Sequence, residues 1–341
     1  MKEVTLSGDG DAPKGAFGHD DRLRPKEVVA GLRVGSDEMA FPFSQLRIAR
    51  VANDRVGGVP VLVVHQPSSD TTTAFEARAK GKVLRFQAGD ADAITLTDLE
   101  THSAWNAYGL CMDGPLKRTQ LKPLVLMGEF WFAWSEFHPR TKVWTAKPVW
   151  EKLVQAPLPE HTLPKLSVVS LPMIPPAPPA PSEPGAGHTH AGPVFGYILQ
   201  GEIENLVEPD PPALYKTGEV FYEIPMHVHR YLHNASKTEP ARVLIFQAGD
   251  TGNRAPAIKL LMEMALSTAA DREVSLSRLT LPPGAASDSG PGIVYVLEGK
   301  IEAAGQLYSQ GDLVVTSATG PALKNASASE PAKLLLYGAS K

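Results

Sequence analysis

The chain has 341 residues and a formal net charge of −4, with lysine and arginine scattered along it. This length predicts two or three domains at roughly 150 residues each, and the charge pattern favours a small-molecule partner over nucleic acid or an anionic membrane surface. No apolar run reaches the ~18 residues of a membrane-spanning helix. The single cysteine, Cys111, excludes an intramolecular disulfide and a cysteine-based zinc cage.

Residues 1–24 are predicted to be an N-terminal tail. They lack the apolar core of a secretory signal, so the sequence is compatible with a cytoplasmic protein or with an exported one whose signal has been removed.

The rest of the chain is predicted to be mainly β. Its 31 prolines and 29 glycines divide it into short apolar runs such as VPVLVVH and ARVLIFQAGD, which is typical of strands in sandwiches or barrels. Residues 256–274, PAIKLLMEMALSTAADREV, carry the best helical period in the chain. That segment is predicted to be either a helix or a strand that enters a loop.

Residues 25–150 are predicted to form a β-rich domain without a recognisable catalytic motif. Three blocks in this part, KEVVAGLRVGSDEMAFPFSQLRIARVANDRVGGVPVLVVHQ, DLETHSAWNAYGLCMDGPLKRTQLKPL and HPRTKVW, resemble in order a bacterial family known as domain of unknown function 3179. Members of that family are often exported, so the resemblance favours a periplasmic or exported protein over a cytoplasmic one. The residues that match the family's pattern are Asn53, Asp54, Trp105, Gly114, Pro115, His138, Pro139 and Thr141.

The chain departs from that family where the family looks reactive. Gln66 and Ser69 stand at the positions of its two cysteines, and Ala49 and Arg50 replace its His-Glu pair. Thiol or metal chemistry is therefore not expected in this domain. Its Asn-Asp pair and its tryptophan are interpreted as a turn and a core residue, with a pocket lining as the alternative.

The second half of the chain contains one unit twice, at residues 160–252 and 257–341. A proline-rich stretch, residues 171–187, leads into the first strands as an extended segment. GHTHAGPVFGYILQGEIE then aligns with AASDSGPGIVYVLEGKIE, and HNASKTEPARVLIFQAG aligns with KNASASEPAKLLLYGAS. In the second copy, Ala286 and Asp288 stand at the positions that correspond to His188 and His190 of the first copy.

Five of the ten histidines of the chain fall between residues 188 and 233. Because side chains alternate along an extended strand, His188 and His190 point the same way and are able to share one ion. His227 and His229 repeat that spacing. Folding an antiparallel sheet on itself would bring the two pairs together in a barrel mouth, which predicts a metal site.

These motifs resemble those of the cupin family. PGAGHTHAGPVFGYILQG supplies His188, His190 and Gly201 of the first motif, and GEVFYEIPMHVHRYLHN supplies Gly218, Pro225, His229 and Asn234 of the second. The resemblance implies two jelly-roll barrels, or double-stranded β-helices, of which the second is degenerate. It also implies His188, His190 and His229 as ligands of a divalent transition metal, with iron favoured and zinc, manganese, copper or nickel as alternatives.

One departure concerns the family's glutamate ligand, whose position falls on Val194 or, with a slip of one residue, on Phe195. A three-histidine site is therefore expected, with His227 as a possible fourth ligand. Similar cupins with three histidines include iron-dependent thiol and diketone dioxygenases. The residues expected to line the substrate pocket are Val194, Phe195, Tyr197, Phe221, Tyr231 and His233.

Two functions remain open on this basis. The first is a metal-dependent oxidoreductase of dioxygenase type that acts on a small organic substrate, with bound metal as the cofactor. The second is a non-catalytic bicupin that binds a small molecule or sugar and holds a structural metal. Pairing into a homodimer is a further expectation, with the second copy as an alternative, internal partner.

Overall fold

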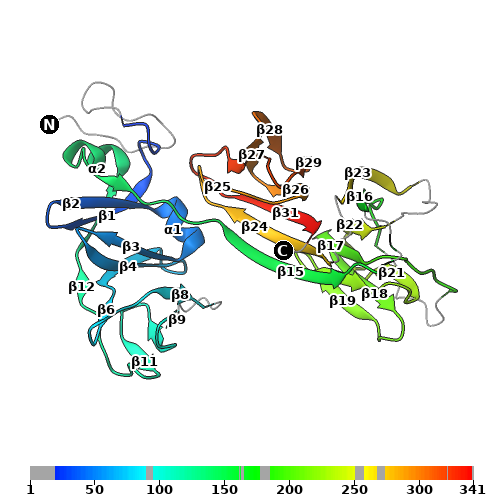
Figure 1. Cartoon of the computed structure of the whole chain (residues 1–341), viewed down its shortest axis with the longest axis horizontal. Coiled ribbons are helices and arrows are strands. Elements are labelled where there is room, and N and C mark those ends of the chain that lie inside the picture. The colour runs from blue at the N-terminus through cyan, green and yellow to red at the C-terminus, as the bar shows by residue number, and fades with distance from the viewer. Residues whose placement is uncertain are drawn as a thin grey trace. The chain divides into compact units, whose positions relative to one another are not determined.

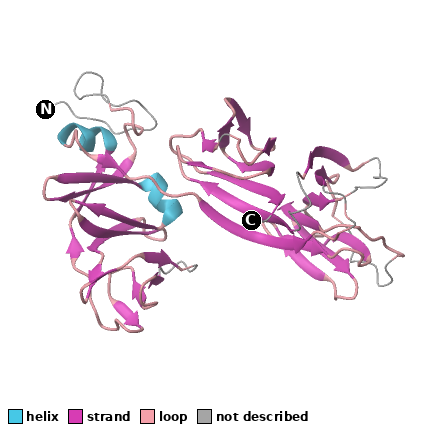
Figure 2. Ribbon diagram, in the orientation of Figure 1, coloured by secondary structure: helices cyan, strands magenta, loops and turns pink. Residues whose placement is uncertain are grey.

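The structure, a computed structural model, describes residues 20–89, 95–160, 162, 165–176, 185–249, 257–266, 273–320 and 322–339. These residues form two compact units. The first contains the described residues up to Val149 together with Leu281–Ala285 and Asn325–Pro331, and the second contains the remainder. Strands make up most of both units, and the described helices both lie in the first (Figures 1 and 2). Neither helix is long and apolar enough to cross a membrane.

The first unit is built from small sheets, antiparallel except for the β2–β14 pair, around two larger cores and one smaller one. Its four-stranded sheets have the orders β13-β1-β2-β14, β11-β10-β9-β8 and β12-β5-β4-β3. Its elements are β1 (Val28–Val34), β2 (Asp37–Pro42), α1 (Phe43–Ala49), β3 (Val51–Val56), β4 (Val59–Gln66), β5 (Thr71–Glu76), β6 (Arg78–Ala79), β7 (Lys82–Val83), β8 (Phe86–Ala88), β9 (Thr95–Asp98), β10 (Ala104–Asn106), β11 (Cys111–Asp113), β12 (Pro123–Leu124), β13 (Leu126–Phe130), α2 (Trp131–Phe137) and β14 (Lys142–Val143).

The β3–β4 hairpin shows how the sequence sets these sheets. Val56 pairs with Val59, which leaves Gly57 and Gly58 as a two-residue turn with φ of 56° and 75°. A turn with positive φ at both positions matches the twist of the two strands and favours glycine. The long apolar strand β4 that follows is buried along most of its length.

The second unit contains the first copy of the repeat and most of the second. Its first copy has the five-stranded sheet β20-β17-β22-β16-β23 and the three-stranded sheet β19-β18-β21. Its elements, together with the two strands that flank it, are β15 (Val149–Pro157), β16 (Lys165–Ser170), β17 (Val194–Gln200), β18 (Glu202–Val207), β19 (Ala213–Lys216), β20 (Val220–Glu223), β21 (His229–Asn234), β22 (Arg242–Ala248) and β23 (Lys259–Ala265).

The second copy repeats this strand order. Its sheets are β15-β24-β31-β26-β29 and β25-β30-β27-β28, so each strand takes the place of its counterpart in the first copy. The mainly β fold with two cupin barrels is thereby confirmed. The strands of this copy are β24 (Glu273–Leu281), β25 (Ala286–Ser287), β26 (Gly292–Glu298), β27 (Lys300–Ala303), β28 (Gln306–Ser309), β29 (Leu313–Thr316), β30 (Leu323–Asn325) and β31 (Ala332–Ala339).

The repeat extends to single hydrogen bonds. The amide of Asn234 donates to the carbonyl of Glu239 at 2.8 Å and accepts from the backbone N–H of Ser236 at 2.9 Å. Asn325 makes the same two bonds, to Glu330 at 2.8 Å and from Ser327 at 2.9 Å. Both asparagines are buried, so each satisfies a turn that would otherwise leave backbone groups unpaired.

The two barrels exchange their outermost strands. Strand β15, which precedes the first copy, is hydrogen-bonded to β24 of the second copy, and β23, which follows the first copy, is hydrogen-bonded to β16 of the first. Each barrel therefore completes its large sheet with a strand from the other copy's part of the chain. Residues 256–274, where a helix or a strand was expected, contribute β23 and the start of β24, so the strand alternative is confirmed over the described residues.

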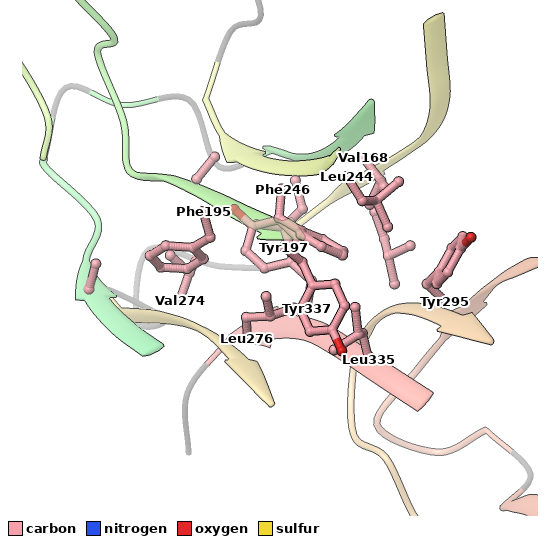
Figure 3. Packing of buried hydrophobic residues seen from close by; sticks show 14 of the residues in the cluster. Val168, Phe195, Tyr197, Leu244, Phe246, Val274, Leu276, Tyr295, Leu335 and Tyr337 are labelled. Atoms are coloured by element: carbon pink, nitrogen blue, oxygen red, sulfur yellow. The ribbon is translucent and has the colours of Figure 1, made fainter. Parts of the chain in front are cut away.

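A shared core lies between the barrels. Phe195, Tyr197 and Phe246 of the first copy pack with Leu335 and Tyr337 of the second, as Figure 3 shows. The ring centroids of Phe246 and Tyr337 lie 5.4 Å apart in an edge-to-face arrangement. Because each barrel buries large aromatic rings against the other, the two copies form one cooperative packing unit.

Two segments discussed from the sequence lie partly outside the residues that the structure describes. These parts are residues 1–19 of the expected N-terminal tail and residues 177–184 of the proline-rich segment. The expected domain boundaries, 1–24, 25–150, 160–252 and 257–341, stay a prediction.

Candidate metal centre

The candidate centre lies where three segments of the first copy meet. His188 and His190 precede β17, His229 begins β21, and Glu223 ends β20. The backbones of His188 and His229 are paired, since the N–H of His188 donates to the carbonyl of His229 at 3.0 Å and the reverse bond is 2.8 Å long. This two-residue antiparallel bridge holds the two imidazoles at adjacent positions across the mouth.

The three predicted histidines come together. His188, His190 and His229 each offer one ring nitrogen, and these nitrogens all lie within 4.8 Å of one another. The Nε2 atoms of His188 and His190 are 3.1 Å apart. Ligands that bind one ion at 2.0–2.2 Å lie at most about 4.4 Å apart, so a small inward movement of the rings suffices to bind a metal.

Burial increases across the cluster in one direction. His188 is exposed, His190 is partly buried, and His229 is 9% exposed. Burial lowers the pKa of His188, the neighbouring His190 and His229 lower it further, and Glu223 opposes the effect. The neutral form of His188, which is the form that binds metal, is thereby favoured.

A carboxylate also lies in the centre, which the sequence interpretation missed. Oε2 of Glu223 is 3.1 Å from Nε2 of His190, and Oε1 of Glu223 is 3.6 Å from Nδ1 of His229. Glu223 is 3% exposed. The signal was present, because a glutamate at the end of an otherwise apolar strand, VFYE, is unusual, but the motif spacing directed attention to Val194.

Several buried polar atoms in the centre have no hydrogen-bond partner within the described protein. They include Oε2 of Glu223 and both ring nitrogens of His229. Unpaired buried polar atoms are costly. A divalent cation bound to one ring nitrogen of His229 and to the carboxylate of Glu223 would satisfy two of these atoms, so the residues present fit a bound metal.

His227, the possible fourth histidine, is not one of the three clustered residues among those that the structure describes. It follows Met226, which has a φ of 65° in the turn between β20 and β21. The backbone N–H of Met226 donates to the carbonyl of His190 at 2.8 Å. This turn links the loop that carries His227 to the first pair of histidines, whereas ligation by His227 stays a prediction.

The expected pocket residues fall on different faces. Val194 and Phe221 belong to the interior core of the first barrel, whereas Phe195 and Tyr197, on alternate positions of β17, belong to the core shared by the two copies. All four are buried.

Tyr231 and His233 lie on the opposite face of the small sheet from His229. The register shifts in β21, so that Val207 faces His229 while Leu206 faces Tyr231. Neighbouring positions on β18 point to opposite faces. The hydroxyl of Tyr231 donates to Glu204 at 2.7 Å, and burial followed by this bond raises the pKa of Tyr231 to about 12.

A cavity of about 720 Å³ lies between the two copies, away from the histidines. Tyr197 and Tyr295 occupy equivalent positions in its wall, as do Arg242 and Lys333. Lys333 pairs with Glu298 at 2.9 Å, and Arg278 lies 3.4 Å from Glu151. None of the three clustered histidines contributes to this wall.

In the second copy, the corresponding strands carry other residues. Ala286, which aligns with His188, pairs with Lys324, which aligns with His233, and Thr316 faces Gly292 where Glu223 faces Val194. The hydroxyl of Thr316 donates to the carbonyl of Gly290 at 2.6 Å.

In the first unit, the residues that match the family of unknown function make structural contacts. The amide of Asn53 donates to the carbonyl of Phe86 at 2.8 Å and accepts from its N–H at 2.7 Å. The rings of His138 and Trp134 are stacked, with their centroids 3.7 Å apart. Nδ1 of His138 lies 2.8 Å from Oε1 of Glu38. The interpretation of Asn53 and Asp54 as a turn is wrong, because both lie within strand β3, opposite Leu62 and Val61. Asn53 instead links β3 to the backbone of Phe86 in β8.

Trp105 and the cysteine are also part of this framework. Nε1 of Trp105 donates to the buried carboxylate of Asp98 at 2.9 Å. Cys111 is buried, and burial raises the pKa of its thiol, so its reactive thiolate form is disfavoured.

Comparison with known proteins finds two different family matches, one in each half of the chain. Residues 11–141 match the family model described as "Protein of unknown function (DUF3179)", and residues 178–246 match the model of the cupin domain. No curated protein matches the chain.

Several solved structures are similar at low identity. The protein YhaK from Escherichia coli is 17% identical over 57% of this chain and 94% of its own, with a TM-score of 0.35. A cupin 2 conserved barrel domain protein from Leptotrichia buccalis is 17% identical over 60% of this chain and 94% of its own, with a TM-score of 0.33. Oxalate decarboxylase from Bacillus subtilis is 12% identical over 56% of this chain and 68% of its own, with a TM-score of 0.32.

Residues 11–141 of this chain are thus similar to the family of unknown function DUF3179, and residues 178–246, which include His188, His190 and His229, are similar to the cupin domain.

Proposed function

We propose that the chain is a metal-dependent cupin enzyme, an oxidoreductase of dioxygenase type that acts on a small organic substrate at His188, His190 and His229. The observation that carries the proposal is the convergence of three imidazole nitrogens, which all lie within 4.8 Å of one another. Oxygenase iron sites keep positions open for substrate and oxygen, and three imidazoles, with or without one carboxylate, leave such positions on a six-coordinate ion. The exposure of His188 supports the catalytic alternative.

The ligand residues differ in burial, which indicates the side from which substrate would reach the centre. His229 and Glu223 form the buried side of the centre, and His188 forms its exposed side, so substrate would approach over His188. A bound divalent metal, iron in the first instance, would supply the Lewis acidity and the redox chemistry. The protein binds and orients the substrate, and the apolar core beneath, which includes Phe221, excludes water from the inner side.

Metal analysis followed by oxygen uptake tests this proposal. Protein purified without a histidine tag is loaded with Fe(II), and uptake is measured with a small thiol and with a β-diketone as probes. We expect one metal ion per chain and oxygen uptake that is lost in His188→Ala. A chain that binds no divalent ion would overturn the proposal. A chain that binds one ion but consumes no oxygen with either probe would contradict the dioxygenase activity and leave a metal-binding protein.

A small-molecule binding role is the second candidate, and the cavity between the two copies favours it. Its wall carries Arg242, Arg278 and Lys333 against Glu151 and Glu298. Because the two carboxylates pair with Lys333 and Arg278, Arg242 adds net positive charge. We therefore expect this cavity to prefer a small anion.

Thermal shift measurements with citrate and phosphate test the second role. Binding in the cavity would raise the melting temperature of the wild type and of His188→Ala alike, and the rise would disappear in Arg242→Ala. A rise that survives in Arg242→Ala would place the anion elsewhere.

A further inference from the structure

We propose that Glu223 supplies the carboxylate ligand of the metal centre, from the strand next to the one on which the cupin motif carries its glutamate. This inference rests on the proposed metal site and adds a ligand to it. The motif's own position is Val194, which is buried and apolar.

The register of the sheet shows why the two positions are interchangeable. Strands β17 and β20 are antiparallel, and Val194 lies directly opposite Glu223. Directly opposed residues project from the same face of a sheet, with Cβ atoms about 4.5–5.5 Å apart. A glutamate at either position is therefore able to reach the same space at the barrel mouth.

The contacts place the carboxylate on the ligating side of the histidines. Oε2 of Glu223 approaches Nε2 of His190, which is the nitrogen that also faces Nε2 of His188. A carboxylate that only orients a metal-bound histidine contacts the ring nitrogen that points away from the metal. Glu223 lies outside the group of three mutually close histidines, but it contacts the ring nitrogen of His190 that faces His188.

The charge of Glu223 supports the same conclusion. The side chain is 3% exposed, and among the described residues its ion-pair partners are His190 and His229, with no lysine or arginine. Oε2 makes no hydrogen bond despite its approach to His190. A buried carboxylate needs a compensating charge, and a divalent cation between Glu223 and the three imidazoles provides it.

Titration of tag-free protein with Co(II) and Zn(II) tests the assignment, with affinity measured by calorimetry and the ligand set followed by the visible spectrum of bound Co(II). We expect the isosteric variant Glu223→Gln to bind at least about 100-fold more weakly and to alter the Co(II) spectrum. Glu204→Gln is the matched control, because Glu204 belongs to the same barrel and bonds Tyr231 on the opposite face of the small sheet. The control should bind like the wild type.

An exchange variant, Val194→Glu with Glu223→Val, adds a gain-of-binding test. We expect it to recover affinity to within about tenfold of the wild type, because the carboxylate returns to the same space from the opposite strand. A folded exchange variant as weak as Glu223→Gln would contradict the interchange.

The assignment fails if Glu223→Gln binds within threefold of the wild type with an unchanged Co(II) spectrum while His190→Ala loses the metal. In that case the three-histidine site stands without Glu223. If the wild type binds neither ion, the proposed function itself fails, so the two failures are distinct.

Discussion

Tyr337 shows how one hydroxyl group limits the stability of the shared core. Its side chain is fully buried among Phe195, Phe246 and other apolar residues, and its hydroxyl has no hydrogen-bond partner within the described protein. Burial raises the pKa of Tyr337 well above its ordinary value, which reflects how poorly this environment solvates a charged or polar group.

We expect Tyr337→Phe to stabilise the second unit by about 1 kcal/mol, because it removes an unpaired buried hydroxyl and keeps the ring. Calorimetric unfolding measures the change. Tyr231→Phe is the contrasting variant, since it removes the bond to Glu204 and should lower stability slightly. A loss of stability in Tyr337→Phe would indicate that the hydroxyl has a bound partner.

Asp98 makes the stability of the first unit depend on pH. Burial alone would raise the pKa of Asp98, but bonds from Trp105, Thr101 and Ser103 outweigh it, and the net pKa lies below the ordinary value of 3.8. A carboxylate with a depressed folded pKa contributes stability that is present above its unfolded pKa and is lost as pH falls through the folded value.

The variant Asp98→Asn should therefore lose roughly 3 kcal/mol relative to the wild type at pH 7, and the difference should shrink as pH falls below about 4. Urea unfolding followed by tryptophan fluorescence measures this, because four of the five tryptophans, all except Trp150, lie in the first unit. A difference that is constant from pH 7 to pH 3 would show that the charge of Asp98 is not responsible.

Single residues also show what the sequence was able to predict. His188, His190 and His229 were found because their period-two spacing is local and visible in the sequence. Glu223 was missed because its role depends on a cross-strand pairing with Val194, which no local spacing reveals. The positions of Tyr231 and His233 depend on a shift of register in β21, which is equally invisible without the neighbouring strand.

Strand β17 has room only for glycine at position 196, because the ring of Phe221 fills the space where a side chain would lie. A Cβ atom at residue 196 would lie 1.9 Å from Cζ of Phe221, which faces Gly196 across the sheet. Phe221 and Glu223 project from the same face of β20. The packing of this pair therefore determines the position of the carboxylate at the metal centre.

We expect Gly196→Ala to destabilise the second unit by about 1–3 kcal/mol through overpacking and to weaken metal binding by displacing β20. The double variant Gly196→Ala with Phe221→Leu should recover part of both losses. Gly128→Ala, where nothing lies within 4 Å of the added atom, is the control. Thermal melts measure the stability, and Co(II) titration measures the metal affinity. If Gly196→Ala is destabilised but binds metal as tightly as the wild type, the packing of Phe221 against Gly196 does not position the metal ligands.

At the level of elements, the sequence predicted strands well because glycine and proline bound each apolar run. Residues 256–274 carry the best helical period in the chain, with a strand that enters a loop as the alternative, and local periodicity did not decide between them. The choice was made by the free edge of β16, with which β23 pairs, and such a tertiary partner is absent from local sequence.

In the whole second unit, the exchange of β15 and β23 couples the two copies. The copies were predicted from internal alignment, but the exchange was not, because alignment compares sequences and does not show which strand completes which sheet. Strand β15, which precedes the first copy, joins the large sheet of the second copy, strand β23 joins that of the first, and both copies contribute to the shared core.

We expect a chain cut between residues 252 and 257, at an inserted protease site, to remain associated. The reason is that the cut leaves β15 with the first fragment and β23 with the second, so that both exchanged strands still bridge the fragments. Size-exclusion chromatography before and after cleavage measures this. Fragments that separate without denaturant would contradict the exchange.

The exchanged strand β23 also shows what the second copy, which lacks the metal-site histidines, contributes to the first copy. Residues 257–341 supply the edge that caps the large sheet of the histidine-bearing barrel, whatever stands at Ala286 and Asp288. A shortened homologue that retained only the first copy would thus present a bare row of amide and carbonyl groups along β16 and would need a second molecule to cover it. In this protein the duplicated segment performs that subunit's task within a single polypeptide.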